Sequence, residues 1–232
     1  MRSPNTSKNL SRRSVVLIPA LNEASTITSV VQGVLPYGTP LVVSDGSSDD
    51  TAELARAAGA EVVELPKNRG YERALDVGFS HAVDHGASEV ITFDADGQFD
   101  SEILGVVKAA MSDPDVRLVI GIRPEFARFG EWLFGMYTQM RFGVSDILCG
   151  AKGYSVSLQK EYGRFGSGSS VGTELALYGL RRNVRFVKVP APVRSRFDSA
   201  SRFGFGWRAN KQILHALWHA VYDDLAALWP RK

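Results

Sequence analysis

Short apolar runs alternate with longer amphipathic segments along most of the chain. Runs rich in valine and isoleucine predict strands over residues 15–18, 41–43, 61–65, 89–93, 117–120 and 184–189. Apolar positions three or four residues apart predict helices over residues 23–35, 48–58, 70–85, 100–111, 171–182 and 206–228. This alternation predicts an α/β fold, in which a mostly parallel central sheet is flanked by helices and followed by a C-terminal amphipathic helix.

The ends of the chain differ from its middle. The polar N-terminal residues lack the alternation, and we expect a flexible basic arm over residues 1–13. One domain is expected over residues 14–205, and the amphipathic helix occupies 206–232. Residues 125–142 mix aromatic with basic side chains. A length of 232 residues suits one domain of ordinary to large size.

Composition narrows the class of protein. With 44% apolar and 22% charged residues, the chain is neither disordered nor fibrous. Cys149 is the single cysteine, so no internal disulfide can form, and no Cys/His cluster has zinc spacing. Apolar stretches fall well short of the roughly 20 residues that span a bilayer, and the polar N-terminus is unlike a signal peptide. We therefore expect a cytoplasmic protein.

The net charge of +2 conceals a basic segment. Residues 181–211 carry nine basic side chains and one acidic one, Asp198. Such a segment fits a solvated face, a phosphate site or contact with an anionic membrane surface. Phenylalanines lie among these bases, but no nucleic-acid-binding motif accompanies them, so we expect no nucleic-acid partner.

The sharpest chemical signal directly follows the predicted strand at 89–93. Asp94 and Asp96 point the same way in an extended chain, and Gln98 adds a carboxamide oxygen two residues further on. Three oxygen ligands at one strand end suit Mg²⁺ or Mn²⁺ bridging a diphosphate. The alternative is a polar turn that caps the next helix. The position of these three residues favours a metal site over a helix cap, because α/β proteins bind their ligands beyond the carboxyl ends of the strands.

Two further polar loops follow the first and second predicted strands. Asp45 ends the second strand and could accept hydrogen bonds from a base or a ribose, while its neighbours Ser48 and Asp49 suit a helix cap. Asn22 and Glu23 follow the first strand and, taken alone, suit the start of a helix. All three loops are expected at the same edge of the sheet.

These loops carry a family resemblance. Segments 15–23 (VVLIPALNE), 42–51 (VVSDGSSDDT), 68–70 with Ala74 and Gly78, and 94–98 (DADGQ) occur in the order and spacing of family 2 glycosyltransferases. The likeness continues through residues 121–123, 146–150 and 196–202, covers about residues 14–205, and is strongest to the polyprenyl-phosphate sugar transferases of the dolichol-phosphate mannose synthase type. It implies a single GT-A domain, with a nucleotide-binding sheet joined to an acceptor-binding half.

The resemblance also implies roles for individual residues. It assigns Pro19, Asn22, Glu23 and Asp45 to the nucleoside pocket, and Asp94, Asp96 and Gln98 to the metal and diphosphate site, with Asp96 counted as catalytic. It assigns Arg123 and Arg196 to the donor diphosphate and acceptor phosphate as catalytic groups, and Asp146 to the acceptor side as a further catalytic residue. Arg202 is assigned to substrate binding near the same phosphates. Ser44 and the triplet Tyr71-Glu72-Arg73 depart from the family pattern.

The function expected from this resemblance is inverting, metal-dependent transfer of a sugar from a nucleotide-diphosphate donor to a polyprenyl phosphate. That acceptor is already ionised at neutral pH. A saccharide hydroxyl, the first alternative, would need a general base such as Glu174 or Asp146. A second alternative is a nucleotide-sugar-binding protein without turnover.

A lipid acceptor implies peripheral attachment to the inner face of the membrane. Residues 125–142 and the apolar stripe of the C-terminal helix would make this contact, unless that stripe is core or a dimer interface. The sequence leaves open the sugar, the base, the lipid length and assembly into a homo-oligomer.

Overall fold

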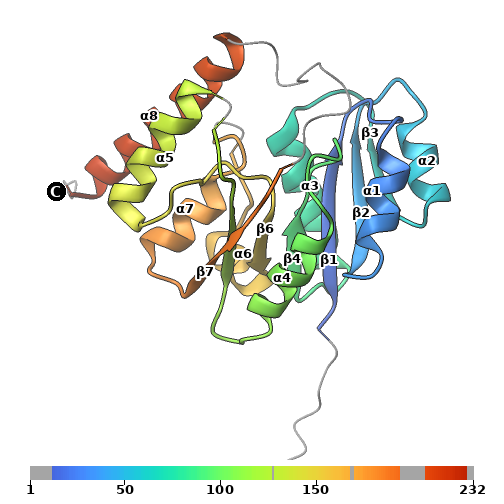
Figure 1. The fold of residues 1–232 in the computed structure, drawn as a ribbon, viewed down its shortest axis with the longest axis horizontal. Coiled ribbons are helices and arrows are strands. Elements are labelled where there is room, and N and C mark those ends of the chain that lie inside the picture. Colours follow the sequence, from blue (N-terminus) through green and yellow to red (C-terminus); the bar gives the residue numbers. More distant parts are fainter. Residues whose placement is uncertain (1–11, 127, 168–169, 194–206, 229–232) are drawn as a thin grey trace, which may run out of the picture.

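The fold is built on one twisted sheet (Figure 1). The computed structural model describes residues 12–126, 128–167, 170–193 and 207–228. Within them, seven strands pair in the order β3-β2-β1-β4-β6-β5-β7. The strands are β1 (Ser14–Ala20), β2 (Thr39–Asp45), β3 (Glu61–Leu65), β4 (Glu89–Thr92), β5 (Leu118–Ile122), β6 (Lys152–Ser155) and β7 (Phe186–Pro190). β6 is antiparallel to both neighbours, and the other pairings are parallel.

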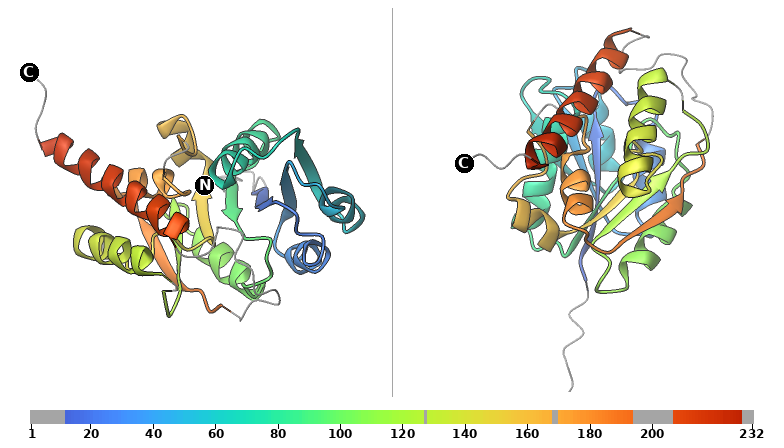
Figure 2. Two further views of the ribbon diagram at one scale, coloured as in Figure 1. Left: turned by 90° about the horizontal axis from the view of Figure 1, so that it is seen from above. Right: turned by 90° about the vertical axis from the view of Figure 1, so that its left-hand side faces the viewer.

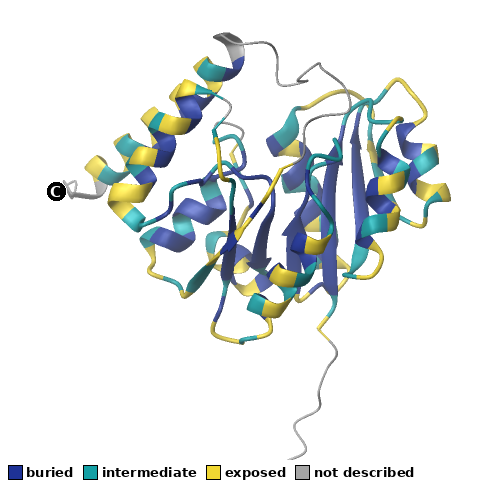
Figure 3. Ribbon diagram, viewed as in Figure 1, coloured by how far each residue is buried: buried dark blue, intermediate teal, exposed yellow. Residues whose placement is uncertain are grey.

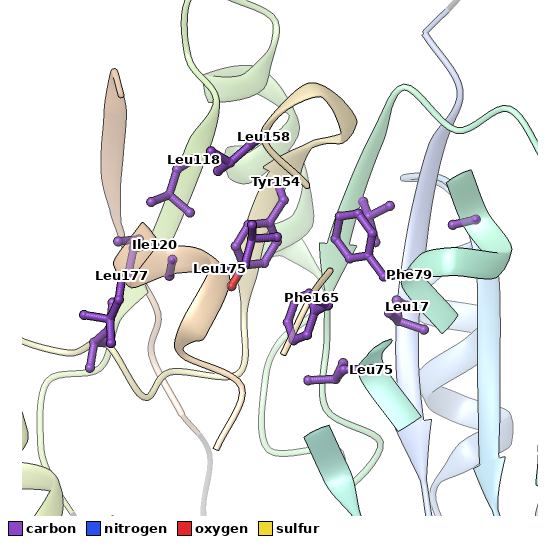
Figure 4. Close-up of a cluster of buried hydrophobic side chains, with 14 of the residues drawn as sticks. Leu17, Leu75, Phe79, Leu118, Ile120, Tyr154, Leu158, Phe165, Leu175 and Leu177 are labelled. Atoms are coloured by element: carbon purple, nitrogen blue, oxygen red, sulfur yellow. The ribbon is translucent and has the colours of Figure 1, made fainter. Parts of the chain in front are cut away.

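Helices cover both faces of the sheet. They are α1 (Ile27–Val34), α2 (Thr51–Ala57), α3 (Tyr71–Asp84), α4 (Glu102–Met111), α5 (Phe129–Phe142), α6 (Val156–Tyr162), α7 (Glu174–Arg181) and α8 (Trp207–Leu228). Alternate residues of β1 point to opposite faces, so Leu17 packs into one core with α3, α6 and α7, and Ile18 packs into the other with α1 and α4. Figure 4 shows the first core, where Phe79 and Phe165 bridge α3 to the second half of the sheet.

This architecture confirms the predicted α/β fold with a mostly parallel sheet, flanking helices and a C-terminal helix. The pattern did not predict β6, α5 or α6. β6 reads Lys152-Gly153-Tyr154-Ser155 and contains no apolar run, so its strand conformation comes from pairing with β4 and β5 rather than from local sequence.

α3 approaches the sheet closely because it carries a glycine at the contact. A Cβ atom on Gly78 would lie 2.2 Å from Cδ1 of Leu17 and 2.8 Å from Cγ2 of Val43. The missing side chain therefore lets the helix lie directly on β1 and β2. This contact fixes the start of α3 beside the carboxyl ends of those strands, where the polar loops lie.

α5 and α8 lie side by side at one end of the molecule (Figure 2). Asn210 accepts a hydrogen bond from the Gly130 N–H near the start of both helices, and Asp224 accepts one of 2.6 Å from the Tyr137 hydroxyl near their ends. The two helices thus run in the same direction. α8 buries Ala209, Ile213 and Ala220 on its inner side. Within the described residues, every helix is too short or too polar to cross a membrane.

Candidate active site

A cavity of about 540 Å³ opens at the carboxyl ends of β1, β2 and β4. Loops after these strands, the end of β5, and the first turns of α3, α5 and α8 surround it. The residues that line it are Pro19, Ala20, Leu21, Glu23, Asp45, Asn68, Gly70, Tyr71, Ala74, Asp94, Ala95, Asp96, Gln98, Arg123, Arg128, Glu131, Leu148, Gly150, Val171, Ala209, Gln212 and Ile213. Three separate polar loops therefore meet at one rim, as the strand alternation predicts.

Asn22 ties the first loop to the second. Its backbone is left-handed (φ +52°), a conformation that asparagine tolerates better than most residues. Its side-chain oxygen accepts a hydrogen bond of 2.7 Å from the Ser48 N–H, and its own N–H donates to the Ser47 hydroxyl at 3.1 Å. Asn22 itself lies outside the cavity lining, whereas Pro19 and Glu23 line it. Asn22 thus holds the rim that its neighbours form.

Asp45 organises the segment before α3. Its side chain is buried, and its two carboxylate oxygens accept hydrogen bonds of 2.7 Å from the N–H groups of Arg69 and Gly70. Gly70 is the N-cap of α3, with φ +91°. Asp45 lines the cavity as well, so one carboxylate both fixes the start of α3 and faces the cavity.

Asp94 lies in the most unusual electrostatic setting of the site. Burial, followed by the negative charge of Asp96, raises its pKa to about 6, against a partly opposing hydrogen bond from Tyr71. The Tyr71 hydroxyl donates that bond at 3.1 Å. On the opposite side, a Cβ atom on Gly150 would lie 2.0 Å from Asp94 Oδ2, so the carboxylate rests against bare backbone. A strained, partly desolvated pair of carboxylates at a strand end is typical of a functional site.

The donor set at this point fits a divalent metal. Asp94, Asp96 and Gln98 all line the cavity and present oxygen ligands. Among the described residues, no group of three or more His, Cys, Asp or Glu side chains is arranged to hold a metal ion by itself. A bound cation would offset the negative charge that Asp96 places beside the buried Asp94 carboxylate, and the remaining ligands of a hard ion can be water or phosphate oxygens.

Arg123 enters the cavity from the end of β5. Its Nε and Nη2 donate to both oxygens of Asp146, at 2.7 and 2.9 Å. Burial lowers the pKa of this guanidinium, but the hydrogen bonds and charge of Asp146 outweigh burial and raise it. Asp146 is 1% exposed and lies behind Arg123, outside the cavity lining. The pair fixes a planar guanidinium at the wall of the cavity.

The sequence did not point to a second ion pair in the cavity wall. Arg128 precedes α5 and donates to Glu131 at 2.7 Å, and Glu131 lies 3.4 Å from Arg123. Both residues line the cavity. The aromatic and basic composition of residues 125–142 was the available signal, but nothing local told which of its bases faces a ligand.

Tyr71, Leu148, Gly150, Val171, Gln212 and Ile213 also line the cavity without having been predicted. Their position depends on packing between distant segments. The triplet Tyr71-Glu72-Arg73 departs from the pattern of the family that the sequence resembles, and this departure is the signal in the sequence that points to Tyr71. Arg196 and Arg202, both expected at the phosphates, lie outside the described residues.

Fold and cavity together define an α/β protein with its ligand site at the carboxyl ends of parallel strands. A family model described as glycosyl transferase family 2 matches residues 15–155, more than half of the chain. The chain therefore belongs to glycosyl transferase family 2. The match includes Asp45, Asp94 and Asp96 and ends at the last residue of β6.

Individual relatives cover less of the molecule. An uncharacterized protein of Methanocaldococcus jannaschii is 30% identical over 161 residues, which are 63% of this chain and 66% of that protein. An undecaprenyl-phosphate 4-deoxy-4-formamido-L-arabinose transferase of Sodalis glossinidius is 33% identical over 115 residues, 44% of this chain and 34% of that protein. The matched part of the chain thus spans 66% or less of these relatives.

Among solved structures, glucosyl-3-phosphoglycerate synthase from Mycobacterium tuberculosis is similar over most of the chain. Its complex with Mn²⁺, UDP-glucose and phosphoglyceric acid has a TM-score of 0.73 at 21% identity and covers 91% of this chain and 80% of that one. Another crystal of the same enzyme contains Mg²⁺ and UDP. This likeness establishes the GT-A fold, as the resemblance in the sequence implied.

Proposed function

We propose that the protein transfers a sugar, with inversion and with the aid of Mg²⁺ or Mn²⁺, from a nucleotide diphosphate to a polyprenyl phosphate at a membrane surface. Membership of glycosyl transferase family 2 supports the transfer of a sugar. The similar transferase of Sodalis glossinidius is named for an undecaprenyl-phosphate acceptor, which supports the lipid acceptor. The metal, the inversion and the lipid acceptor are what the proposal adds.

Asp94, Asp96 and Gln98 would hold the metal. Bound there, the cation would neutralise charge on the diphosphate leaving group. Arg123 would add a fixed guanidinium at the same wall, held in its orientation by Asp146 before the substrate arrives. Asp45 and the loop of Pro19 and Glu23 would enclose the nucleoside at the other end of the cavity.

The observation that carries the lipid acceptor is an apolar surface on α5 and α8, which we call the outer apolar face. Side chains spaced three or four residues apart on each helix form it, on the side away from the core, where Figure 3 colours the ribbons as exposed. Its members are Phe129, Trp132, Met136 and Met140 on α5, and Leu214, Trp218, Tyr222 and Leu225 on α8. Met140 is 76% exposed, and Phe129 and Trp218 are each 65% exposed.

This face begins beside the cavity. Arg128 and Glu131 at the start of α5, and Ala209, Gln212 and Ile213 at the start of α8, line the cavity. Phe129 directly follows Arg128 and points to solvent. A bilayer docked on the outer apolar face would therefore lie next to the cavity, and a lipid phosphate could reach Arg123 and Arg128 without leaving the headgroup layer.

The side chains of the outer apolar face suit a membrane interface. Tryptophan and tyrosine prefer the headgroup region, and exposed bases such as Lys211 and Arg141 attract anionic lipid. Exposed large apolar side chains gathered on two neighbouring helices are typical of an interaction site. A second copy of the chain could also cover it, which the experiment below distinguishes.

The cavity also fits an acceptor that is already ionised. The two candidate bases for a hydroxyl acceptor are both engaged elsewhere, since Asp146 is bound to Arg123 and Glu174 accepts hydrogen bonds from the N–H and hydroxyl of Ser167. Neither lines the cavity. A polyprenyl phosphate has a second pKa of about 6 and needs no base at neutral pH.

Product analysis tests the acceptor. The protein is incubated with Mn²⁺, radiolabelled nucleotide sugars and vesicles that contain undecaprenyl phosphate, or instead with a water-soluble acceptor such as 3-phosphoglycerate. Label in an organic-soluble, acid-labile product with inverted anomeric configuration supports the proposal. Transfer to the soluble acceptor alone favours the hydroxyl alternative, and donor binding without transfer to either favours a binding protein.

Vesicle binding tests the outer apolar face. We expect the protein to sediment with anionic vesicles at low salt and to be partly released at high salt. Trp132→Ser with Trp218→Ser should weaken this binding at least tenfold. Leu35→Ser with Val106→Ser is the matched control, because these exposed apolar residues lie at the end of α1 and on α4. Vesicle binding equal in both double variants would contradict the proposal, as would a dimer that dissociates only when Trp132 and Trp218 are changed.

A further inference from the structure

Val171 has a backbone conformation that its residue type disfavours. Among the described residues, only Asn22, Val171 and Asn183 are non-glycine residues with positive φ. Asparagine adopts this region readily, and Asn183 ends α7 in the ordinary way, donating its N–H to Leu180. Valine is β-branched and pays a steric penalty at φ +52°. Surrounding contacts must therefore impose this conformation.

A buried carboxylate next to the cavity imposes it. Glu72, in the first turn of α3, accepts hydrogen bonds from the N–H (2.9 Å) and the hydroxyl of Ser170. The backbone of Gly166 lies against the same carboxylate, since a Cβ there would be 2.2 Å from Glu72 Oε1. On the other side of Val171, the Thr173 hydroxyl donates to the Ser170 carbonyl at 2.7 Å. The residues before and after Val171 are thus fixed to α3 and to each other.

This arrangement sets the Val171 side chain into the cavity wall. Val171 lines the cavity near Tyr71, Ala74 and Leu148. The next residue, Gly172, lies so close to the Tyr71 ring that a Cβ would be 3.2 Å from it. Tyr71 in turn donates to Asp94, so the wall that contains Val171 adjoins the carboxylate beside which the proposed function places the diphosphate.

We propose that Val171 is a specificity-determining residue, whose methyl groups contact the apolar C–H face of the sugar being transferred. The inference rests on the proposed function, because it requires a nucleotide sugar in this cavity. The strained backbone places a branched apolar side chain where the sugar leaves the diphosphate, and Glu72 is the residue that holds it there. The contact belongs to the sugar alone, so a nucleoside diphosphate without sugar does not sense it.

Two substitutions separate contact from strain. Val171→Gly removes both the methyl groups and the steric penalty at positive φ, and we expect the melting temperature to rise by about 2–4 °C. Val171→Ala removes the methyl groups but keeps a Cβ, so it gives no such rise. Asn183→Gly is the matched control: it has nearly the same φ, +51°, but its residue is absent from the cavity lining.

The measurement is calorimetric binding with Mn²⁺ of UDP-glucose, UDP-N-acetylglucosamine and GDP-mannose, each beside its own nucleoside diphosphate. We use the donor whose sugar adds most affinity in the wild type. Val171→Gly and Val171→Ala should both lose about tenfold in affinity for that donor, and the Kd of the nucleoside diphosphate should stay within twofold. Asn183→Gly should change neither.

The outcomes separate the two proposals. If the wild type binds none of these donors, the proposed function fails and the role of Val171 fails with it. If the wild type gains affinity from the sugar and both Val171 variants keep that gain, the proposed function stands and the role of Val171 is wrong. Equal weakening of donor and diphosphate would also contradict it, since that result reports a displaced wall rather than a lost sugar contact.

Discussion

At the scale of single residues, the site depends on small distances around Asp94. The carboxylate is held between the Tyr71 hydroxyl and the bare backbone of Gly150, and Asp96 raises its pKa further after burial. A buried carboxylate beside a second negative charge destabilises the folded protein when no cation is bound. Active sites commonly lose stability in this way for the sake of function. The glycine is as much part of the proposed metal site as the two carboxylates.

Gly150→Ala should therefore impair metal binding directly. The new Cβ would lie 2.0 Å from Asp94 Oδ2, so the carboxylate has to move. We expect at least a tenfold weaker Mn²⁺ affinity in a calorimetric titration and a loss of turnover of about 100-fold, in the same direction as Asp96→Asn. Gly105→Ala on α4 is the control, because the three nearest atoms to its Cβ all belong to Tyr37. Unchanged Mn²⁺ affinity in Gly150→Ala would rule out Asp94 as a ligand.

Glu174 gives the molecule a pH dependence away from the metal site. Burial raises its pKa, but hydrogen bonds from Ser167 and Tyr162 and the charge of Arg164 together outweigh burial and hold the pKa below its ordinary value. The folded state thus binds fewer protons than the unfolded state, and the stability contributed is full above the ordinary pKa and lost as pH falls through the lowered one.

Glu174→Gln should accordingly destabilise the fold at neutral pH and matter less in acid. Replacing a charged acceptor of several hydrogen bonds should cost about 1–3 kcal/mol, or roughly 2–4 °C in melting temperature per kcal/mol. The difference in melting temperature from wild type should be largest at pH 7 and should shrink progressively as the pH falls from about 4.5. A difference that is constant between pH 7 and pH 3 would show that the carboxylate charge contributes nothing.

At the scale of elements, the apolar pattern of the sequence predicted the strands that are buried on both faces of the sheet. β1 and β2 are continuous apolar runs because parallel strands are covered on both sides, and their prediction was confirmed. β6 was not predicted because Lys152, Gly153, Tyr154 and Ser155 contain no apolar run and form a strand only between β4 and β5. The contacts of α5 and α8 with the cavity likewise depend on segments about 80 residues apart, such as Gly130 and Asn210.

The same reasoning applies to the site. Asp45, Asp94 and Asp96 could be predicted because they lie at or just beyond the carboxyl ends of recognisable strands, so topology alone brings them to one rim. Val171 could not be predicted, since its place in the cavity depends on a buried glutamate 99 positions earlier holding the adjacent Ser170. Tertiary contact, not local propensity, decided that part of the site.

Gly78→Ala tests the contact that positions α3. Its Cβ would meet Leu17 Cδ1 at 2.2 Å, so helix or strand must shift, and overpacking of this kind costs about 1–3 kcal/mol. We expect a lower melting temperature and, because the start of α3 carries Tyr71, weaker donor binding as well. Ser80→Ala, exposed on the same helix, should change neither. A melting temperature equal to wild type would mean that α3 does not pack as tightly as described.

At the scale of the whole molecule, the cavity joins two halves of one sheet. The loops after β1, β2 and β4 supply the proposed nucleoside and metal side, whereas the segments of β5, α5 and α8 supply Arg123, Arg128 and Ile213. A ligand that fills the cavity touches both halves, so its binding energy adds to the stability of the folded chain as a unit. The proposed metal makes this effect conditional, because the diphosphate and the carboxylates repel each other without it.

Nucleotide and metal together should therefore stabilise the protein by more than the sum of what each does alone. At a ligand concentration of 100 times Kd, mass action adds about 2.7 kcal/mol, which corresponds to a rise of roughly 5–11 °C in melting temperature. Differential scanning fluorimetry with Mn²⁺ and UDP-glucose, GDP-mannose or the free diphosphates measures the rise, and EDTA should abolish it reversibly. Asp96→Asn should keep the metal-free melting temperature close to wild type and lose the ligand-induced rise. A rise with nucleotide that persists in EDTA would contradict the metal role of Asp94 and Asp96 while leaving the cavity as the nucleotide site.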